Sequence, residues 1–120
     1  MYICVLASTP DADDIPYDPS AYMKGYRWKQ HHVEPSNVEK QIKALMDEGV
    51  EVFINLCDGT PDDALSGIAL VHALEKYNAA FTGADSKFFD PTRDEMKNAA
   101  RRVSVPTPNW VFVNRAEDAE

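Results

Sequence analysis

Two short runs of apolar residues constrain the fold of this chain more than any other feature. They are YICVLA, residues 2–7, and VEVFINLC, residues 50–57. A strand with one face in water alternates apolar and polar residues, whereas a strand covered on both faces is apolar nearly throughout. We therefore predict that both runs are inner strands of a parallel sheet with layers on both sides.

Three further segments read as strands. Residues 26–34 are β-prone but mostly polar, which indicates a strand near the sheet edge. Residues 79–83, AAFTG, predict a short strand, and residues 109–113, NWVFV, predict a final one. Residues 8–25 hold three prolines and four aspartates, so we expect a long loop with one helical turn near Ser20.

Three helices are predicted from their start and stop signals. Ser36 and Glu39 have the spacing of a capping box, and Gly49 follows the last apolar position of that helix. The other two helices are expected to begin at Thr60 and Asp90, each of which precedes a proline at the first helical position. Strands and helices therefore alternate along most of the chain.

This alternation predicts an α/β fold, specifically a Rossmann-like three-layer domain with a mainly parallel sheet. The chain has 120 residues, which fits one domain. We take residues 1–113 as that domain and residues 114–120, NRAEDAE, as the start of a linker.

Charge and cysteine content exclude several classes of partner. The formal net charge of −8 disfavours nucleic acid and anionic membranes, because both carry negative charge. Cys4 and Cys57 each lie inside an apolar run and match no metal or redox spacing, so we expect buried thiols in a reducing compartment. The first residues lack the basic region of a signal peptide, and we predict a cytoplasmic protein.

The turn that follows the second apolar run is acidic where nucleotide-binding turns are rich in glycine. It reads DGTPDD from Asp58 and would repel a bare phosphate at close range. Asp62 and Asp63 suit the start of a helix, where acids are favourable. Asp58 has two open interpretations: it caps the turn, or it faces a ligand with a positive group such as an amine. A magnesium site made from these acids has no spacing motif in its favour.

The histidines give no metal site by spacing. His31 and His32 are neighbours on a predicted strand, so their side chains point to opposite faces and cannot easily share one ion. His72 lies on the apolar stripe of the second predicted helix, where a boundary histidine is the simpler interpretation. We expect no metal ligands in this chain and assign no catalytic residue from spacing.

Residues 52–113, about half of the chain, resemble a known family. The motifs are Asp58-Gly59, Ser66-Gly67, Phe81-Thr82-Gly83 and the run VPTP at residues 105–108. Their order and spacing are similar to the N-terminal domain of D-alanine–D-alanine ligase-like ATP-grasp enzymes. The resemblance implies a Rossmann-like pre-ATP-grasp domain, and a chain that is the substrate-side part of an ATP-dependent carboxylate–amine ligase.

In such ligases, two further domains hold ATP and magnesium, and the reaction proceeds through an acyl phosphate. The resemblance thus implies ATP and magnesium in a longer enzyme, none in this part alone, and a small amino acid or peptide as the substrate. This part alone would not be catalytic. The surface left by absent domains would be apolar, so self-association into a homodimer is an open expectation.

The resemblance also assigns residues. Asp58 stands where the family has a histidine that helps to place the first substrate, and Gly59 follows it. The carboxylate of the first loop could come from Asp11, Asp13 or Asp14, and we take Asp13 as the candidate. Arg93 aligns with a lysine that precedes the third helix and is expected to contact ATP phosphates.

An alternative interpretation needs no catalysis. The same fold could be a stand-alone Rossmann-like module that binds a small ligand or a partner. The length of the natural reading frame separates the two, because the ligase requires about two hundred further residues for its other domains (roughly one or two domains of ordinary size). A flavodoxin-like nucleotide binder is disfavoured by the acidic turn.

Overall fold

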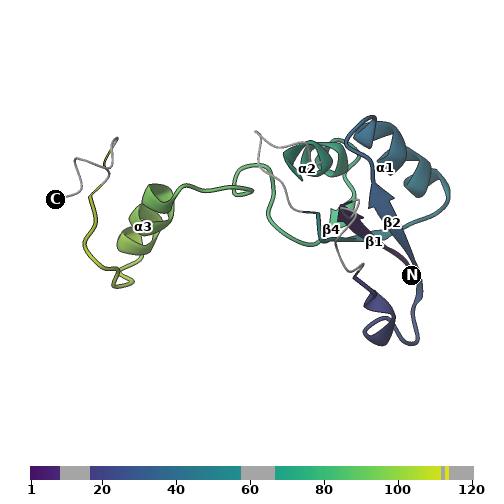
Figure 1. Cartoon of the computed structure of the whole chain (residues 1–120), viewed down its shortest axis with the longest axis horizontal. Coiled ribbons are helices and arrows are strands. Elements are labelled where there is room, and N and C mark those ends of the chain that lie inside the picture. The colour runs from purple at the N-terminus through teal and green to yellow at the C-terminus, as the bar shows by residue number, and fades with distance from the viewer. Residues whose placement is uncertain (9–16, 58–66, 112, 114–120) are drawn as a thin grey trace. The chain divides into compact units, whose positions relative to one another are not determined.

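The computed structural model describes residues 1–8, 17–57, 67–111 and 113 (Figure 1). The chain divides into two compact units, Met1–Phe89 and Asp90–Glu120, and each is described by itself. The predicted single domain over residues 1–113, followed by a linker, stays a prediction.

The first unit contains a four-stranded sheet in which every neighbouring pair of strands is parallel. The strand order is β2-β1-β3-β4. The strands are β1 (Tyr2–Ser8), β2 (Arg27–Val33), β3 (Val52–Asn55) and β4 (Ala80–Phe81), and the helices are the 3₁₀ turn η1 (Pro19–Ala21), α1 (Val38–Asp47) and α2 (Gly67–Lys76). This architecture confirms the predicted α/β, Rossmann-like fold with a parallel sheet.

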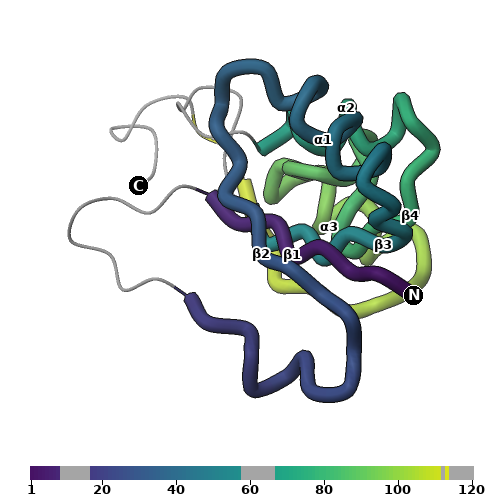
Figure 2. The backbone as a smooth tube through the Cα atoms, turned by 90° about the vertical axis from the view of Figure 1, so that its right-hand side faces the viewer, coloured from purple at the N-terminus to yellow at the C-terminus, as the bar shows by residue number. Residues whose placement is uncertain are grey.

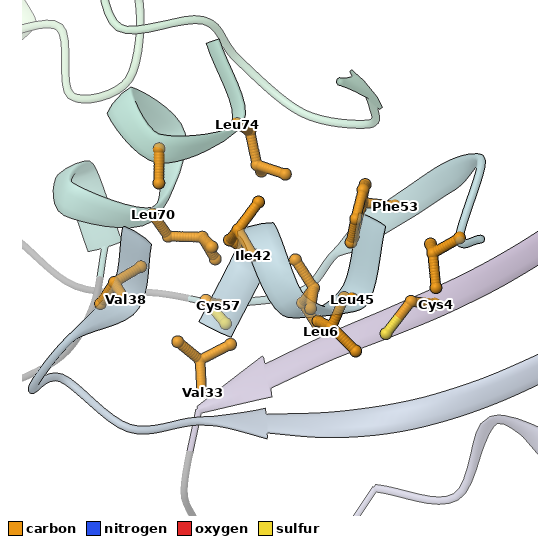
Figure 3. Close-up of a cluster of buried hydrophobic side chains, with 12 residues drawn as sticks. Cys4, Leu6, Val33, Val38, Ile42, Leu45, Phe53, Cys57, Leu70 and Leu74 are labelled. Carbon is orange, nitrogen blue, oxygen red and sulfur yellow. The ribbon is translucent and has the colours of Figure 1, made fainter. Parts of the chain in front are cut away.

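One face of the sheet carries the main hydrophobic core, under α1 and α2 (Figure 3). Cys4 and Leu6 from β1 and Phe53 from β3 are fully buried there. Ile42 from α1 and Leu70 from α2 cover them, and both are also fully buried. The apolar stripes of two helices therefore close over a strand that is itself apolar.

The opposite face of β1 has a smaller core. Ile3 and Val5 alternate with the residues of the main core and pack with Met23, which follows η1. Figure 2 shows the segment that contains η1 on the side of the sheet away from α1 and α2. Both faces of β1 are thus buried, as the unbroken apolar run predicts.

The predicted start of α1 is wrong. Ser36 is not the N-cap; Asn37 occupies that position with φ of 61° and makes no side-chain capping bond. Asparagine tolerates this left-handed conformation better than most residues. The Gln41 side chain organises the turn instead, because its amide donates to the carbonyls of Glu34 (2.8 Å) and Ser36 (3.0 Å). Gly49, with φ of 93°, ends the helix as predicted.

The second unit contains α3 (Arg93–Arg102), and its predicted start also differs. Thr92, rather than Asp90, is the N-cap, and it forms a reciprocal capping box with Glu95. The Thr92 hydroxyl accepts from the Glu95 amide (3.2 Å), while the Glu95 carboxylate accepts from the Thr92 amide (2.8 Å). A paired box satisfies two helix-end donors, so it fixes the start two residues later.

The final strand predicted at residues 109–113 is not found among the residues that the structure describes. Trp110 packs against α3 instead. Its indole nitrogen donates to Asp94 (3.0 Å), and the Arg101 guanidinium lies 3.9 Å from the ring centroid. A strand needs a neighbouring strand for its hydrogen bonds, whereas here the aromatic side chain is held by a cation and a carboxylate from the helix.

Candidate functional site

The strand order places a topological switch point between β1 and β3. The chain leaves β1 toward β2 on one side and leaves β3 toward β4 on the other. Ligands of open parallel sheets bind beyond the carboxyl ends of the strands at such a point. We therefore treat this end of the sheet as the candidate site and call it the carboxyl edge, formed by Ser8, His32, Asn55, Leu56 and Thr82.

The substrate residues expected from the resemblance lie next to the carboxyl edge in the sequence. Asp58 and Gly59 follow Cys57 directly, and Asp13 belongs to the segment that follows Ser8. All three lie outside the described residues. Their assignment to a substrate stays a prediction.

Two polar side chains of the carboxyl edge are used by the fold itself. The Thr82 hydroxyl accepts from the Asn55 amide (3.1 Å), and the Asn55 side-chain oxygen accepts from the Cys57 amide (3.0 Å). The Thr82 amide donates to the carbonyl of Phe53 (3.0 Å). Thr82 thereby ties the end of β4 to β3, and Gly83 follows with φ of 104°, a conformation that favours glycine. Within the family-like motif TG, both residues thus have local structural roles.

The Ser8 hydroxyl differs from these side chains. Its oxygen is buried and, within the described ranges, it is the only buried side-chain nitrogen or oxygen with no hydrogen-bond partner. A buried hydroxyl without a partner destabilises a fold by about 1–3 kcal/mol. The carboxyl edge therefore carries a buried polar group that no described residue pairs with.

The neighbouring histidines have different and well-defined partners. The Gln41 side-chain oxygen accepts from the Glu34 amide (3.1 Å), so it is an acceptor and the Nε2 atom of His31 must donate to it (3.1 Å). The Nδ1 atom of His32 lies 3.2 Å from the Ser8 carbonyl, which can only accept. We therefore assign a proton to Nδ1 of His32, and in the neutral ring the Nε2 atom then carries a lone pair.

No metal site is apparent in the part of the chain that the structure describes, where no three His, Cys, Asp or Glu side chains cluster. His31 and His32 bind different partners, one in α1 and one in β1, and do not converge. His72 is exposed on α2, 3.7 Å from Glu75.

The two cysteines are buried, as predicted. Burial raises the pKa of the Cys4 thiol to about 11, because the charged thiolate loses its hydration. The thiolate is the reactive form of cysteine, so Cys4 is unreactive at neutral pH. Neither the position nor the charge state of Cys4 fits a nucleophile.

Arg93, the residue expected to contact ATP phosphates, is the first residue of α3. It is exposed, and two acids, Asp94 and Glu95, follow it in the first helical turn. Asp94 already holds Trp110 and Asn98, and Glu95 holds Thr92. The role of Arg93 toward ATP stays a prediction.

Sequence reasoning missed the roles of Ser8 and His32. Ser8 directly follows the first predicted strand and His32 lies near the end of the second, and this placement was the available signal. Comparison with protein-family models, curated proteins and solved structures finds no match for this chain. No helix among the described residues has the length and apolar character needed to cross a membrane.

Proposed function

We propose that this chain is the N-terminal, substrate-side domain of an ATP-dependent carboxylate–amine ligase of the D-alanine–D-alanine ligase-like type. One observation carries the proposal. The two family-like motifs Asp58-Gly59 and Thr82-Gly83 each follow a strand, and these strands, β3 and β4, are parallel neighbours in the sheet. The carboxyl ends of neighbouring parallel strands meet at one edge of the sheet, which is where such sheets bind ligands.

The charge of the chain supports an amine-bearing substrate. The formal net charge is −8, and Asp58 adds a carboxylate three residues after the end of β3 in the sequence. An ammonium group is attracted by such a charge, whereas a carboxylate or phosphate is repelled. The proposed substrate is therefore an amino acid or small peptide that presents its amino group toward Asp58.

ATP and magnesium would be held by further domains in this proposal, with Arg93 contributing a contact to the ATP phosphates. The exposed guanidinium of Arg93 can bind phosphate oxygens in a planar, bidentate manner. The proposal places the protein in the cytoplasm, which supplies ATP and keeps the buried thiols reduced.

The test begins with the natural reading frame. The proposal expects the coding sequence to continue beyond Glu120 into domains that carry magnesium-binding carboxylates, and the longer protein to release phosphate from ATP only when amino acids are added. A natural stop after Glu120 would overturn it in favour of the stand-alone binding module. The same holds for a longer protein that shows no ATP turnover with any pair of amino acids or small peptides.

A matched pair of variants tests the Asp58 assignment. Removing a charged hydrogen bond costs about 1.5–3 kcal/mol, so Asp58→Asn in the longer protein should raise KM for the amino substrate about tenfold or more. Asp62→Asn changes an acid of the same turn that suits the helix start, and it should leave KM unchanged. Equal KM values for both variants and the parent protein would exclude Asp58 as a substrate contact.

A further inference from the structure

His32 presents at the carboxyl edge a hydrogen-bond acceptor that no described residue uses. Its Nδ1 atom is 3.2 Å from the Ser8 carbonyl, which can accept but not donate. In the neutral ring this contact fixes the proton on Nδ1 and leaves the lone pair on Nε2. His32 is exposed, and no residue of the described ranges bonds to its Nε2 atom.

His32 lies near the carboxyl end of the edge strand β2, next to β1, which is one of the two strands that border the switch point. His32 pairs with Ala7 in the register of β1 and β2, one residue before both strands end at Ser8 and Val33. The backbone of Ser8 therefore connects the ring to the strand that borders the switch point. An imidazole held through one nitrogen by a backbone carbonyl has a fixed orientation, as a group that contacts a ligand requires.

We propose that the Nε2 atom of His32 accepts a hydrogen bond from the amino group of the ligand bound at the carboxyl edge. This inference rests on the proposed function, because it specifies which end of an amino acid substrate meets this part of the edge. A neutral Nε2 atom accepts from an ammonium donor and offers nothing to a carboxylate, which is itself only an acceptor. His32 is thus a binding residue that selects an amine.

The other two histidines serve as internal controls. His31 uses its Nε2 atom to donate to Gln41, so it has no acceptor on that nitrogen. His72 is exposed on α2 and has Glu75 as its neighbour. An amine that binds at His32 should leave the ring signals of both unchanged, whereas a non-specific effect of the added amine would move all exposed rings together.

The first experiment is a ¹⁵N NMR titration of the histidine rings in the full chain at constant pH. Ethylamine and alanine both carry an ammonium group, whereas propionate matches alanine in carboxylate and size but has no amine. The inference expects ethylamine and alanine to shift the Nε2 signal of His32 and propionate to leave it in place. No shift with either amine into the high millimolar range, or an equal shift with propionate, would overturn it.

A second experiment measures how a substitution of His32 changes the affinity of the chain for alanine. His32→Asn retains a side-chain N–H that can reach the Ser8 carbonyl but has no atom at the Nε2 position. We expect it to weaken alanine binding about tenfold, while His72→Asn binds alanine as the parent chain does. An amide spectrum like that of the parent would show that the variant is folded, and unchanged affinity in such a variant would refute the role of His32.

These results separate the inference from the proposed function. If amines shift His32 but the longer protein has no ATP-dependent ligation, the amine site stands and the ligase proposal fails. If the longer protein ligates amino acids and His32→Asn leaves KM for each of them unchanged, the ligase proposal stands and the role of His32 fails.

Discussion

Replacing Ser8 by alanine should stabilise the first unit. The Ser8 hydroxyl is buried and has no hydrogen-bond partner among the described residues, which costs about 1–3 kcal/mol. Alanine removes that oxygen and leaves a void of roughly 20 Å³, which at about 24 cal/mol per Å³ costs about 0.5 kcal/mol. Taking a penalty of about 1.5 kcal/mol for the hydroxyl, the free energy of unfolding should rise by about 1 kcal/mol.

Urea unfolding monitored by fluorescence measures this change. A Trp110→Phe background leaves Trp28, which packs on the smaller core of the first unit, as the reporter. With a urea slope of about 1.5 kcal/mol per M, the midpoint of Ser8→Ala should rise by about 0.7 M. Ser36→Ala is the control: Ser36 is exposed and does not cap α1, so its midpoint should change little. A midpoint for Ser8→Ala that falls below the parent value would refute the reasoning, because it would mean that the hydroxyl is paired.

Three further predictions concern helix ends and titrating groups. Hydrogen bonds from Lys76 and Tyr77 hold the pKa of Glu39 below its ordinary value of 4.5. The contribution of Glu39 to stability is therefore present above that pH and lost as the pH falls below it, and Glu39→Gln should flatten this part of a pH–stability curve measured by urea unfolding. Cys4, with a pKa of about 11, should resist a thiol reagent at pH 7 in the folded chain and react once urea unfolds it, which mass spectrometry of the labelled peptide detects. Thr92→Ala removes the N-cap of α3 and should destabilise that helix by about 1 kcal/mol, visible as faster amide exchange in its first turn; unchanged exchange would contradict the capping box.

The sheet could be predicted from the sequence because a strand that is apolar along its whole length is stable only where both of its faces are covered. The unbroken run at residues 2–7 requires two covered faces, and β1 has them. The polar run ending at Val33 indicates an edge, and β2 is the outer strand next to β1. The hydrophobic effect is roughly proportional to the buried apolar area. The pattern of apolar positions along a strand therefore predicts which of its faces are buried, even when the residues that pack on them are not known.

Helix starts and the last strand were less predictable because they depend on competition between nearby residues. Ser36 and Asn37 are both suitable N-caps. Asn37 takes the position because it tolerates a positive φ, and the Gln41 side chain stabilises the turn by donating to the Ser36 carbonyl. Asp90 and Thr92 compete in the same way, and the pairing with a glutamate three residues on decides for Thr92. The spacing of Thr92 and Glu95 is a capping-box pattern present in the sequence, so the start of α3 could have been predicted, whereas no such pattern singles out Gln41 at the start of α1.

Two residues of the carboxyl edge, Thr82 and His32, differ in whether the fold already uses their hydrogen-bonding groups. Thr82 belongs to the family-like TG motif, yet its hydroxyl oxygen accepts from the Asn55 amide and its own amide donates to the Phe53 carbonyl, both in β3. His32 belongs to no motif, yet its bond to the Ser8 carbonyl fixes a neutral tautomer whose second nitrogen has no partner among the described residues. Groups that the fold has already paired contribute to binding through the shape that they maintain, whereas unpaired groups can gain a new bond when a ligand arrives. The proposed amine contact therefore predicts that His32→Asn lowers the affinity for an amine more than it lowers the free energy of unfolding, and that Thr82→Ala does the reverse.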